Sequence, residues 1–200
     1  MSPRADVSEE RKNQIIDAAI KVFNKLGFHN ARMDDIVDES GLSKGTLYWY
    51  FKSKDEIIIN VLEKVFLREL DELKRLGELD QPVPDLLFQY IDITVKDFKS
   101  FEPMIPLLFE FIAFASRSKI TRKLLSKYYD IFMETLTPII ERGIMEGTII
   151  ETDPNNIAKA LGALIEGTIL LKYYSPDTID LGKQMQENSR LLIEGVLKNH

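Results

Sequence analysis

The sequence has no cysteine, and its only histidines are His29 and His200. A chain without cysteine forms no disulfide framework and offers neither a thiol nucleophile nor a thiolate metal cage. Two histidines cannot make a histidine cluster. The acids Glu110, Glu141 and Glu166 also have no nucleophile or metal partner at a telling spacing. We therefore expect no metal site, no cofactor and no enzymatic activity.

Long hydrophobic runs are also lacking. The most apolar stretch, residues 103–115, has about 13 residues and contains Glu110, whereas a membrane span needs about 20. The first twenty residues include Arg4, Asp6 and Glu9 and lack the apolar segment of a secretory signal. This pattern predicts a cytoplasmic protein with no membrane partner.

Positive charge is in short supply overall, because 26 basic residues face 32 acidic ones and the net charge is −6. Residues 40–54 are an exception, since they contain three lysines and no acid. A local positive face on an acidic body can steer a protein onto a phosphate backbone. Charge alone fits a solvated lysine-rich loop at least as well, so it leaves both interpretations open.

What the sequence does contain is helical periodicity. Apolar residues recur at spacings of three and four almost throughout, as in Ile15, Ala19, Val22, Phe23 and Leu26. Strand-like alternation is almost absent. The composition, 44% hydrophobic and 29% charged, is typical of a folded chain with a substantial core. We predict an all-α fold of about nine helices.

Residue types near position 41 and position 53 predict helix boundaries. Gly41 permits a turn between two short helices. Ser53 and Glu56 have the spacing of a capping box, in which each side chain binds the backbone N–H of the other residue. We therefore expect a long helix from Ser53 to Gly77.

Further along the chain, Asp153 and Pro154 are typical of a helix start, and Asp177 or Thr178 is expected to cap the last helix. The helix that Pro103 opens is apolar nearly all round, so the sequence predicts that it is buried.

Residues 41–51 read GLSKGTLYWYF, and the first half of this segment suits a DNA-reading helix. Ser43 can cap the helix, and Lys44 then lies in its first turn. Gly45 would let the backbone approach a phosphate or a base edge closely. Thr46 combines a hydroxyl with a methyl group, which suits the major groove.

The aromatic half of the segment has two expected roles. Tyr48, Trp49 and Tyr50 can contact thymine methyl groups or donate hydroxyl hydrogen bonds to phosphates. The alternative is that they only pack the small helical core. The spacing of Leu47 and Phe51 predicts that these two residues face inward.

The segment from about Ser8 to Ile59 resembles the N-terminal domain of the TetR family of transcriptional regulators. The resemblance implies a three-helix DNA-binding domain with a helix-turn-helix at residues 1–53 and a helical ligand-binding and dimerisation domain at residues 54–200. The matching residues are Ile15, Ala18, Ala19, Phe23, Gly27, Phe28, Asp35, Ile36 and the run SGLSKGTLYWYFKSKDEI at positions 40–57.

The resemblance also implies which residues contact DNA. Recognition-helix residues would face bases or backbone, two further residues would contact phosphates, and Trp49 lies at a position where such readers differ in site preference. The recognition-helix residues are Lys44, Gly45, Thr46 and Tyr48, after the capping Ser43, and the phosphate contacts are Tyr50 and Lys54.

The sequence departs from the family pattern at Ala31 and Arg32, where the family usually has Thr or Ser. A hydroxyl three residues before Asp35 would form a capping box, and Arg32 cannot. Either Asn30 caps the second helix while Arg32 reaches a phosphate, or the helix is slightly frayed and Arg32 lies in solvent.

An effector cavity inside the C-terminal bundle is implied by the same resemblance. The body is rich in aromatic residues and methionine, which favours a largely apolar pocket for a lipophilic or aromatic compound, although each such residue alone is more often core. The candidate ligand-binding residues are Phe88, Tyr90, Phe98, Phe101, Met104, Phe109, Tyr128 and Phe132.

Gly162 and Gly167 lie within a helical segment, where each costs about 1 kcal/mol relative to alanine. Close approach of another helix would explain both, either within one subunit or in the four-helix dimer interface that the family resemblance implies. The predicted interface residues are Ile157, Leu161, Gly162, Ile165, Leu181, Met185, Leu192 and Val196.

Together these expectations describe a ligand-responsive transcriptional regulator. We expect a homodimeric repressor that binds a palindromic operator in double-stranded DNA and is released by a largely apolar small molecule, which would tilt the helix from Ser53 to Leu76. The alternative is a helical ligand-binding or structural bundle that does not bind DNA.

Overall fold

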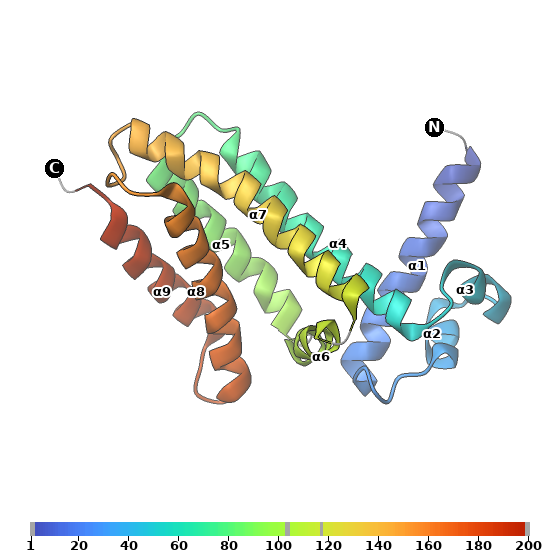
Figure 1. Cartoon of the computed structure of the whole chain (residues 1–200). Helices are drawn as coiled ribbons and strands as arrows, with labels where there is room; N and C mark the ends of the chain where they lie inside the picture. Colours follow the sequence, from blue (N-terminus) through green and yellow to red (C-terminus); the bar gives the residue numbers. More distant parts are fainter. Residues whose placement is uncertain (1–2, 103–104, 117, 199–200) are drawn as a thin grey trace. The chain divides into compact units, whose positions relative to one another are not determined.

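The computed structural model describes residues 3–102, 105–116 and 118–198 (Figure 1). In this part of the chain the regular structure is helical, apart from one antiparallel bridge between Ile149 and Leu197. The all-α prediction is therefore confirmed. The α-helices are α1 (Pro3–Leu26), α2 (Met33–Ser40), α3 (Lys44–Tyr50), α4 (Lys54–Gly77), α5 (Val83–Phe101), α6 (Ile105–Ala115), α7 (Lys119–Met145), α8 (Pro154–Tyr174) and α9 (Leu181–Val196).

The helices form two compact units. The first contains Met1–Phe66 and Pro106–Leu124, and the second contains Leu67–Ile105 and Leu125–His200. The unit that includes α1, α2 and α3 therefore extends past residue 53 and takes in most of α6. Among the described residues, no helix is both long and apolar enough to cross a membrane.

In the first unit, α1 packs on α2, and α2 packs on α3. Their contacts bury one face of each helix, as the helical spacing predicts: Ile15 and Ala19 of α1, Ile36 of α2 and Leu47 of α3 are all fully buried. Phe51, directly after α3, is 2% exposed and closes this core. This small apolar core fixes the orientation of the short helix α3.

The turn between α2 and α3 depends on Gly41. This residue has φ +66°, in the left-handed region that favours glycine, and its N–H donates to the carbonyl of Val37 to end α2. A Cβ atom there would meet nothing within 4 Å, so the constraint is conformational and not steric crowding.

Helix α2 begins at Met33, with Arg32 as its N-cap; the prediction that Asn30 caps it is wrong, and the exposure of Arg32 agrees with the other alternative. Asn30 does not cap α2, because its side-chain amide donates to the carbonyl of Leu26 at the end of α1, 3.1 Å away. Instead, the Asp35 carboxylate accepts the backbone N–H of Arg32 at 2.7 Å. The helix start is thus held from its third residue, and Arg32 is left exposed as its N-cap.

At the start of α4, the predicted capping box is only half formed. The Ser53 hydroxyl accepts the N–H of Glu56 at 3.2 Å. The Glu56 carboxylate, however, accepts the N–H of Lys52 at 2.6 Å and not that of Ser53. The sequence spacing identified both side-chain acceptors, but the N–H that donates to Glu56 is one position earlier than predicted.

In the second unit, α9 packs against α5 and α8. The Asp153 carboxylate caps α8 as predicted, by accepting the N–H of Asn155 at 2.9 Å, and hydrogen bonds from Asn155 lower the pKa of Asp153. The cap of α9 was predicted wrongly. Asp180, not Asp177 or Thr178, accepts the N–H of Lys183 at 3.0 Å.

Helix α6 is also less buried than its apolar sequence predicts. Leu107 and Phe111 are buried, but Ile112 is 45% exposed. The predicted start of this helix at Pro103 lies outside the described residues.

The left-handed Gly41 generates a stability prediction. Gly41→Ala should lower the free energy of unfolding by about 1–2 kcal/mol, because a Cβ disfavours the left-handed conformation. Urea denaturation monitored by circular dichroism measures this change.

Gly45→Ala is the matched control, because Gly45 has no positive φ and lies in a helix, where alanine is favoured. The control should be neutral or stabilising. Equal losses in the two variants would contradict the role assigned to the Gly41 backbone.

Candidate nucleic-acid interface

Helix α3 is positioned by the two residues that it buries. Leu47 is fully buried, and Phe51 is almost so, which confirms the prediction that both face inward. With those side chains fixed, the opposite side of α3 presents Gly45 and Trp49 to solvent, and Lys44 is exposed at the start of the helix. The exposed residues of α3 are thus set by its core residues.

Trp49 and Tyr48 are not core residues of the three-helix unit. Trp49 is 68% exposed and Tyr48 is 37% exposed. The rings of Trp49 and Tyr50 meet edge to face with centroids 4.5 Å apart, which orients the indole. The Tyr50 hydroxyl lies 3.4 Å from that of Ser8 on α1, so Tyr50 is the most enclosed of the three.

The start of α3 presents hydroxyl groups and bare backbone. The Ser43 hydroxyl accepts the N–H of Thr46 at 3.0 Å, and the hydroxyl oxygens of these two residues are 2.8 Å apart. Only one of the two hydroxyl protons is used between them, so the pair keeps one donor for another acceptor. A Cβ at Gly45 would meet only the Ser43 hydroxyl, at 3.8 Å, so the backbone there is open to a close approach.

Lys44, the first residue of α3, forms an ion pair with Asp34 of α2. The Lys44 Nζ to Asp34 Oδ1 distance is 2.6 Å, and both side chains are more than 60% exposed. The hydrogen bond and charge of Asp34 raise the pKa of Lys44. Sequence reasoning missed Asp34, since nothing in the spacing of the two helices reveals which acid of α2 meets α3.

Lys54, a predicted phosphate contact, has its ammonium directed at backbone carbonyls of the same unit. Its ammonium donates to the backbone carbonyls of Phe28, Ala31 and His29, the last two at 2.8 and 3.3 Å. The same ammonium is 4.4 Å from the centroid of the Phe28 ring. Burial lowers the pKa of Lys54, against smaller opposing effects of Asp55 and Glu110. Lys54 therefore ties the start of α4 to the loop between α1 and α2.

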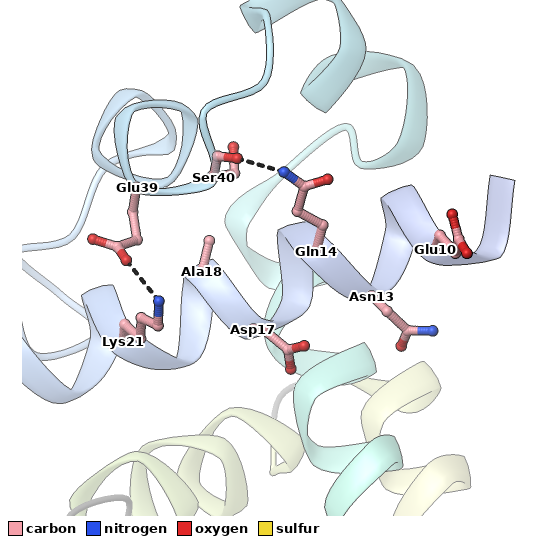
Figure 2. A pocket seen from close by; sticks show the side chains of 8 residues that line it. All are labelled: Glu10, Asn13, Gln14, Asp17, Ala18, Lys21, Glu39 and Ser40. Carbon is pink, nitrogen blue, oxygen red and sulfur yellow. Dashed lines mark hydrogen bonds and ion pairs between the residues drawn. The ribbon is translucent and has the colours of Figure 1, made fainter. Parts of the chain in front are cut away.

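The first unit also has a polar groove between α1 and α2, with a volume of about 560 Å³. Figure 2 shows that Lys21 and Glu39 meet across this groove, where their charged atoms are 3.1 Å apart, and that Gln14 donates to the carbonyl of Ser40. No predicted site residue lines it. Its lining residues are Glu10, Asn13, Gln14, Asp17, Ala18, Lys21, Glu39 and Ser40.

The predicted ligand-binding residues are divided between the two units. Phe109 belongs to the first unit. In the second, Tyr90 and Phe132 are buried, and Phe88 and Tyr128 are half-buried. Met104 and the side chains of Phe98 and Phe101 lie outside the described residues. Among the residues described, no group of three or more histidine, aspartate or glutamate side chains could hold a metal ion.

The predicted interface residues separate into two groups. Ile157, Leu161, Leu181 and Met185 are at most 4% exposed within a single subunit, so they belong to its own core. Gly162, Ile165, Leu192 and Val196 are half-buried. A Cβ at Gly162 would lie 3.2 Å from the ring of Phe132, so Gly162 accommodates α7 of the same subunit. A Cβ at Gly167 would meet nothing within 4 Å.

The two short helices, the left-handed glycine between them and the exposed polar and aromatic edge of α3 define a helix-turn-helix DNA-binding protein. Residues 15–61 match the family described as bacterial regulatory proteins, tetR family, and residues 104–197 match the BetI-type transcriptional repressor, C-terminal family. The two matches together cover more than half of the chain. The chain belongs to the TetR family of transcriptional regulators.

Relatives match over nearly the whole length. The chain is 29% identical to the uncharacterized HTH-type transcriptional regulator YfiR of Bacillus subtilis, over 99% of this chain and 98% of that protein.

Two solved structures share the fold. SmeT, the repressor of the Stenotrophomonas maltophilia multidrug efflux pump SmeDEF, has a TM-score of 0.78 at 20% identity, over 94% of this chain and 91% of SmeT, and was also solved with triclosan. A regulator from Saccharomonospora viridis in complex with choline has a TM-score of 0.82 at 19% identity, over 96% of this chain and all of that chain.

The position of Lys54 generates a prediction that separates folding from DNA contact. Lys54→Met should lower the free energy of unfolding by about 1–2 kcal/mol, because it leaves half-buried carbonyls without their charged donor. Its effect on the salt dependence of DNA binding should be small. Urea denaturation and fluorescence anisotropy at several salt concentrations measure the two quantities.

Lys52→Met is the matched control, because the Lys52 ammonium is exposed and its only described hydrogen bond is to the carbonyl of Tyr48. The control should fold normally. A loss of about one unit of salt slope in Lys54→Met with unchanged stability would restore Lys54 as a phosphate contact.

Proposed function

We propose that this TetR-family chain is a ligand-responsive repressor that binds a palindromic operator as a homodimer. The observation that carries the proposal is the exposure of Lys44, Gly45 and Trp49 on a helix whose Leu47 is fully buried. A rigidly held helix with an open edge can enter the major groove, whereas the same residues in a mobile loop could not keep a register on bases.

The DNA-contact proposal assigns separate roles along this edge. Lys44 and the Ser43–Thr46 hydroxyl pair meet base or phosphate acceptors, and Gly45 allows the close approach of the backbone. Tyr48 and Trp49 add apolar contacts to thymine methyl groups. Arg32 is exposed at the start of α2 and would reach a phosphate. To reach a phosphate, the Tyr50 hydroxyl would have to break its hydrogen bond with the Ser8 hydroxyl.

In the proposed dimer, two copies of α3 would enter successive major grooves about 34 Å apart, or a related distance once the DNA is deformed. An effector would release the protein by changing this separation through α4, which has residues in both compact units. Because coupling between two sites is reciprocal, operator DNA should weaken effector binding by the same factor.

DNA upstream of the chain's own coding region provides the direct test of DNA binding. An electrophoretic mobility shift should show a complex with this DNA that unrelated duplex competes away only in large excess. A protein that folds as a dimer and shifts neither this DNA nor any duplex selected from a random library would instead be a ligand-binding bundle without DNA binding.

For the effector, we propose a largely apolar or aromatic small molecule. Support comes from the aromatic residues of the second unit and from the ligands of two similarly folded proteins, triclosan and choline. A quaternary ammonium such as choline is itself recognised by aromatic faces. Thermal-shift screening of phenols, acyl compounds and quaternary amines, followed by release of bound DNA, tests this class. Hits confined to small, highly charged compounds without an aromatic, acyl or quaternary ammonium group would contradict it.

For the dimer, we propose the outward face of α8 and α9. On α8, Ala163, Gly167, Leu171 and Tyr174 follow one another at spacings of three and four, and Leu171 and Tyr174 are 47% and 68% exposed. On α9, Leu191 is 62% exposed. Exposed apolar side chains gathered beside an open glycine are typical of a helix-packing surface.

This choice of face generates a prediction. Leu171→Glu should raise the dimer dissociation constant at least tenfold, since it places a carboxylate in an apolar interface, while circular dichroism stays unchanged. Multi-angle light scattering over a range of concentrations measures the effect.

Ile112→Glu on α6 is the matched control, because Ile112 is 45% exposed and lies outside α8 and α9. It should remain dimeric. A wild-type chain that is monomeric at micromolar concentration would reject the dimer altogether.

A further inference from the structure

The ion pair between Lys44 and Asp34 is not needed for α2 and α3 to fold. Asp35, and not Asp34, caps α2, and α3 is capped by Ser43. Both charged side chains are more than 60% exposed, and exposed ion pairs add little to stability. The main effect of the pair is therefore on the exposed surface of α3, where it places a carboxylate beside the first residue of the helix.

The carboxylate changes the charge that this surface presents. Of the three lysines at positions 40–54, Lys54 is bound to backbone carbonyls, and Lys44 is matched by Asp34 at 2.6 Å. Lys52 lies after α3, is exposed, and donates to one carbonyl of that helix, the carbonyl of Tyr48, at 2.6 Å. Attraction to an arbitrary phosphate backbone is thus weaker than the lysine content suggests.

We propose that Asp34 is a specificity-determining residue for DNA, acting by holding Lys44. This inference rests on the proposed DNA-contact role of α3. On non-specific duplex, Lys44 stays paired with Asp34 and displaces no counterion, while the carboxylate is repelled by nearby phosphates. On a cognate sequence, a well-placed base or phosphate acceptor replaces Asp34 as the partner of Lys44.

Asp34 and an acceptor on the DNA compete for one ammonium, that of Lys44. The Asp34 carboxylate, 2.6 Å from the ammonium, competes with an arbitrary phosphate for it, so part of the attraction of Lys44 to non-specific DNA is lost. An acceptor that α3 holds in register can displace Asp34, because it is positioned by all the other contacts at once. Asp34 therefore lowers non-specific affinity more than operator affinity.

Salt dependence provides the test. Asp34→Asn keeps the size of the side chain and frees the charge of Lys44. Fluorescence anisotropy with a random-sequence 30-base-pair duplex should give tighter binding, up to about eightfold at 0.1 M salt for each reading helix in contact. The plot of log affinity against log salt should steepen by about 0.9 for each such helix. Affinity for a duplex selected with the wild-type protein should rise less, so the specificity ratio falls.

The control is Glu39→Gln, which makes the same change in charge and frees Lys21 from a 3.1 Å ion pair in the α1–α2 groove. Its salt slope should stay within a few tenths of wild type. An equal steepening in both variants would mean that only net charge matters, which would overturn the role of Asp34.

A double variant isolates the part played by Lys44. In a Lys44→Ala background, Asp34→Asn should gain little affinity for the random duplex, because no ammonium remains to be freed. A full gain in that background would leave only repulsion by the carboxylate and would overturn the holding role. If the wild-type chain binds no duplex even at low salt, the DNA-contact proposal itself fails. If it binds and Asp34→Asn changes neither slope nor affinity, only the present inference fails.

Discussion

The burial of Leu47 and Phe51 is the constraint on which the exposed surface of α3 depends. Helix α3 has seven residues, and an isolated helix of that length is not stable in water. Packing against α2 and the rest of the core therefore supplies both its stability and its rotation about its own axis. Once these two side chains are inside, the outward direction of Gly45 and Trp49 follows from helix geometry.

Two of the lysines near α3, Lys44 and Lys54, are held by contacts within the same unit. The loop after α1 turns its carbonyls toward the start of α4, and they bind the ammonium of Lys54. A lysine that sequence alone assigns to phosphate thereby joins two segments of the fold. Together with the Lys44–Asp34 pair, this leaves recognition to geometry more than to net attraction, as suits a chain with a net charge of −6.

The sequence predicted the helices and the buried side of α3 because apolar periodicity and Gly41 act locally. It failed where several polar residues compete for one cap. Asp177, Thr178 and Asp180 all suit an N-cap, and in the structure the helix begins after Asp180. Asp34 was missed for a related reason, since its partner lies on another helix. The contacts of individual side chains with DNA, effector and a second subunit remain predictions.

The two glycines of α8 illustrate how a single sequence signal can have two causes. Each costs helix stability, and sequence alone assigned both to close helix packing. Gly162 is explained within the subunit, because the ring of Phe132 occupies the space that a side chain would need. Among the residues that the structure describes, none occupies that space at Gly167. Gly167 shares its face with the exposed Leu171 and Tyr174, so in the proposed dimer a second copy of α8 in close contact would explain the glycine at this position.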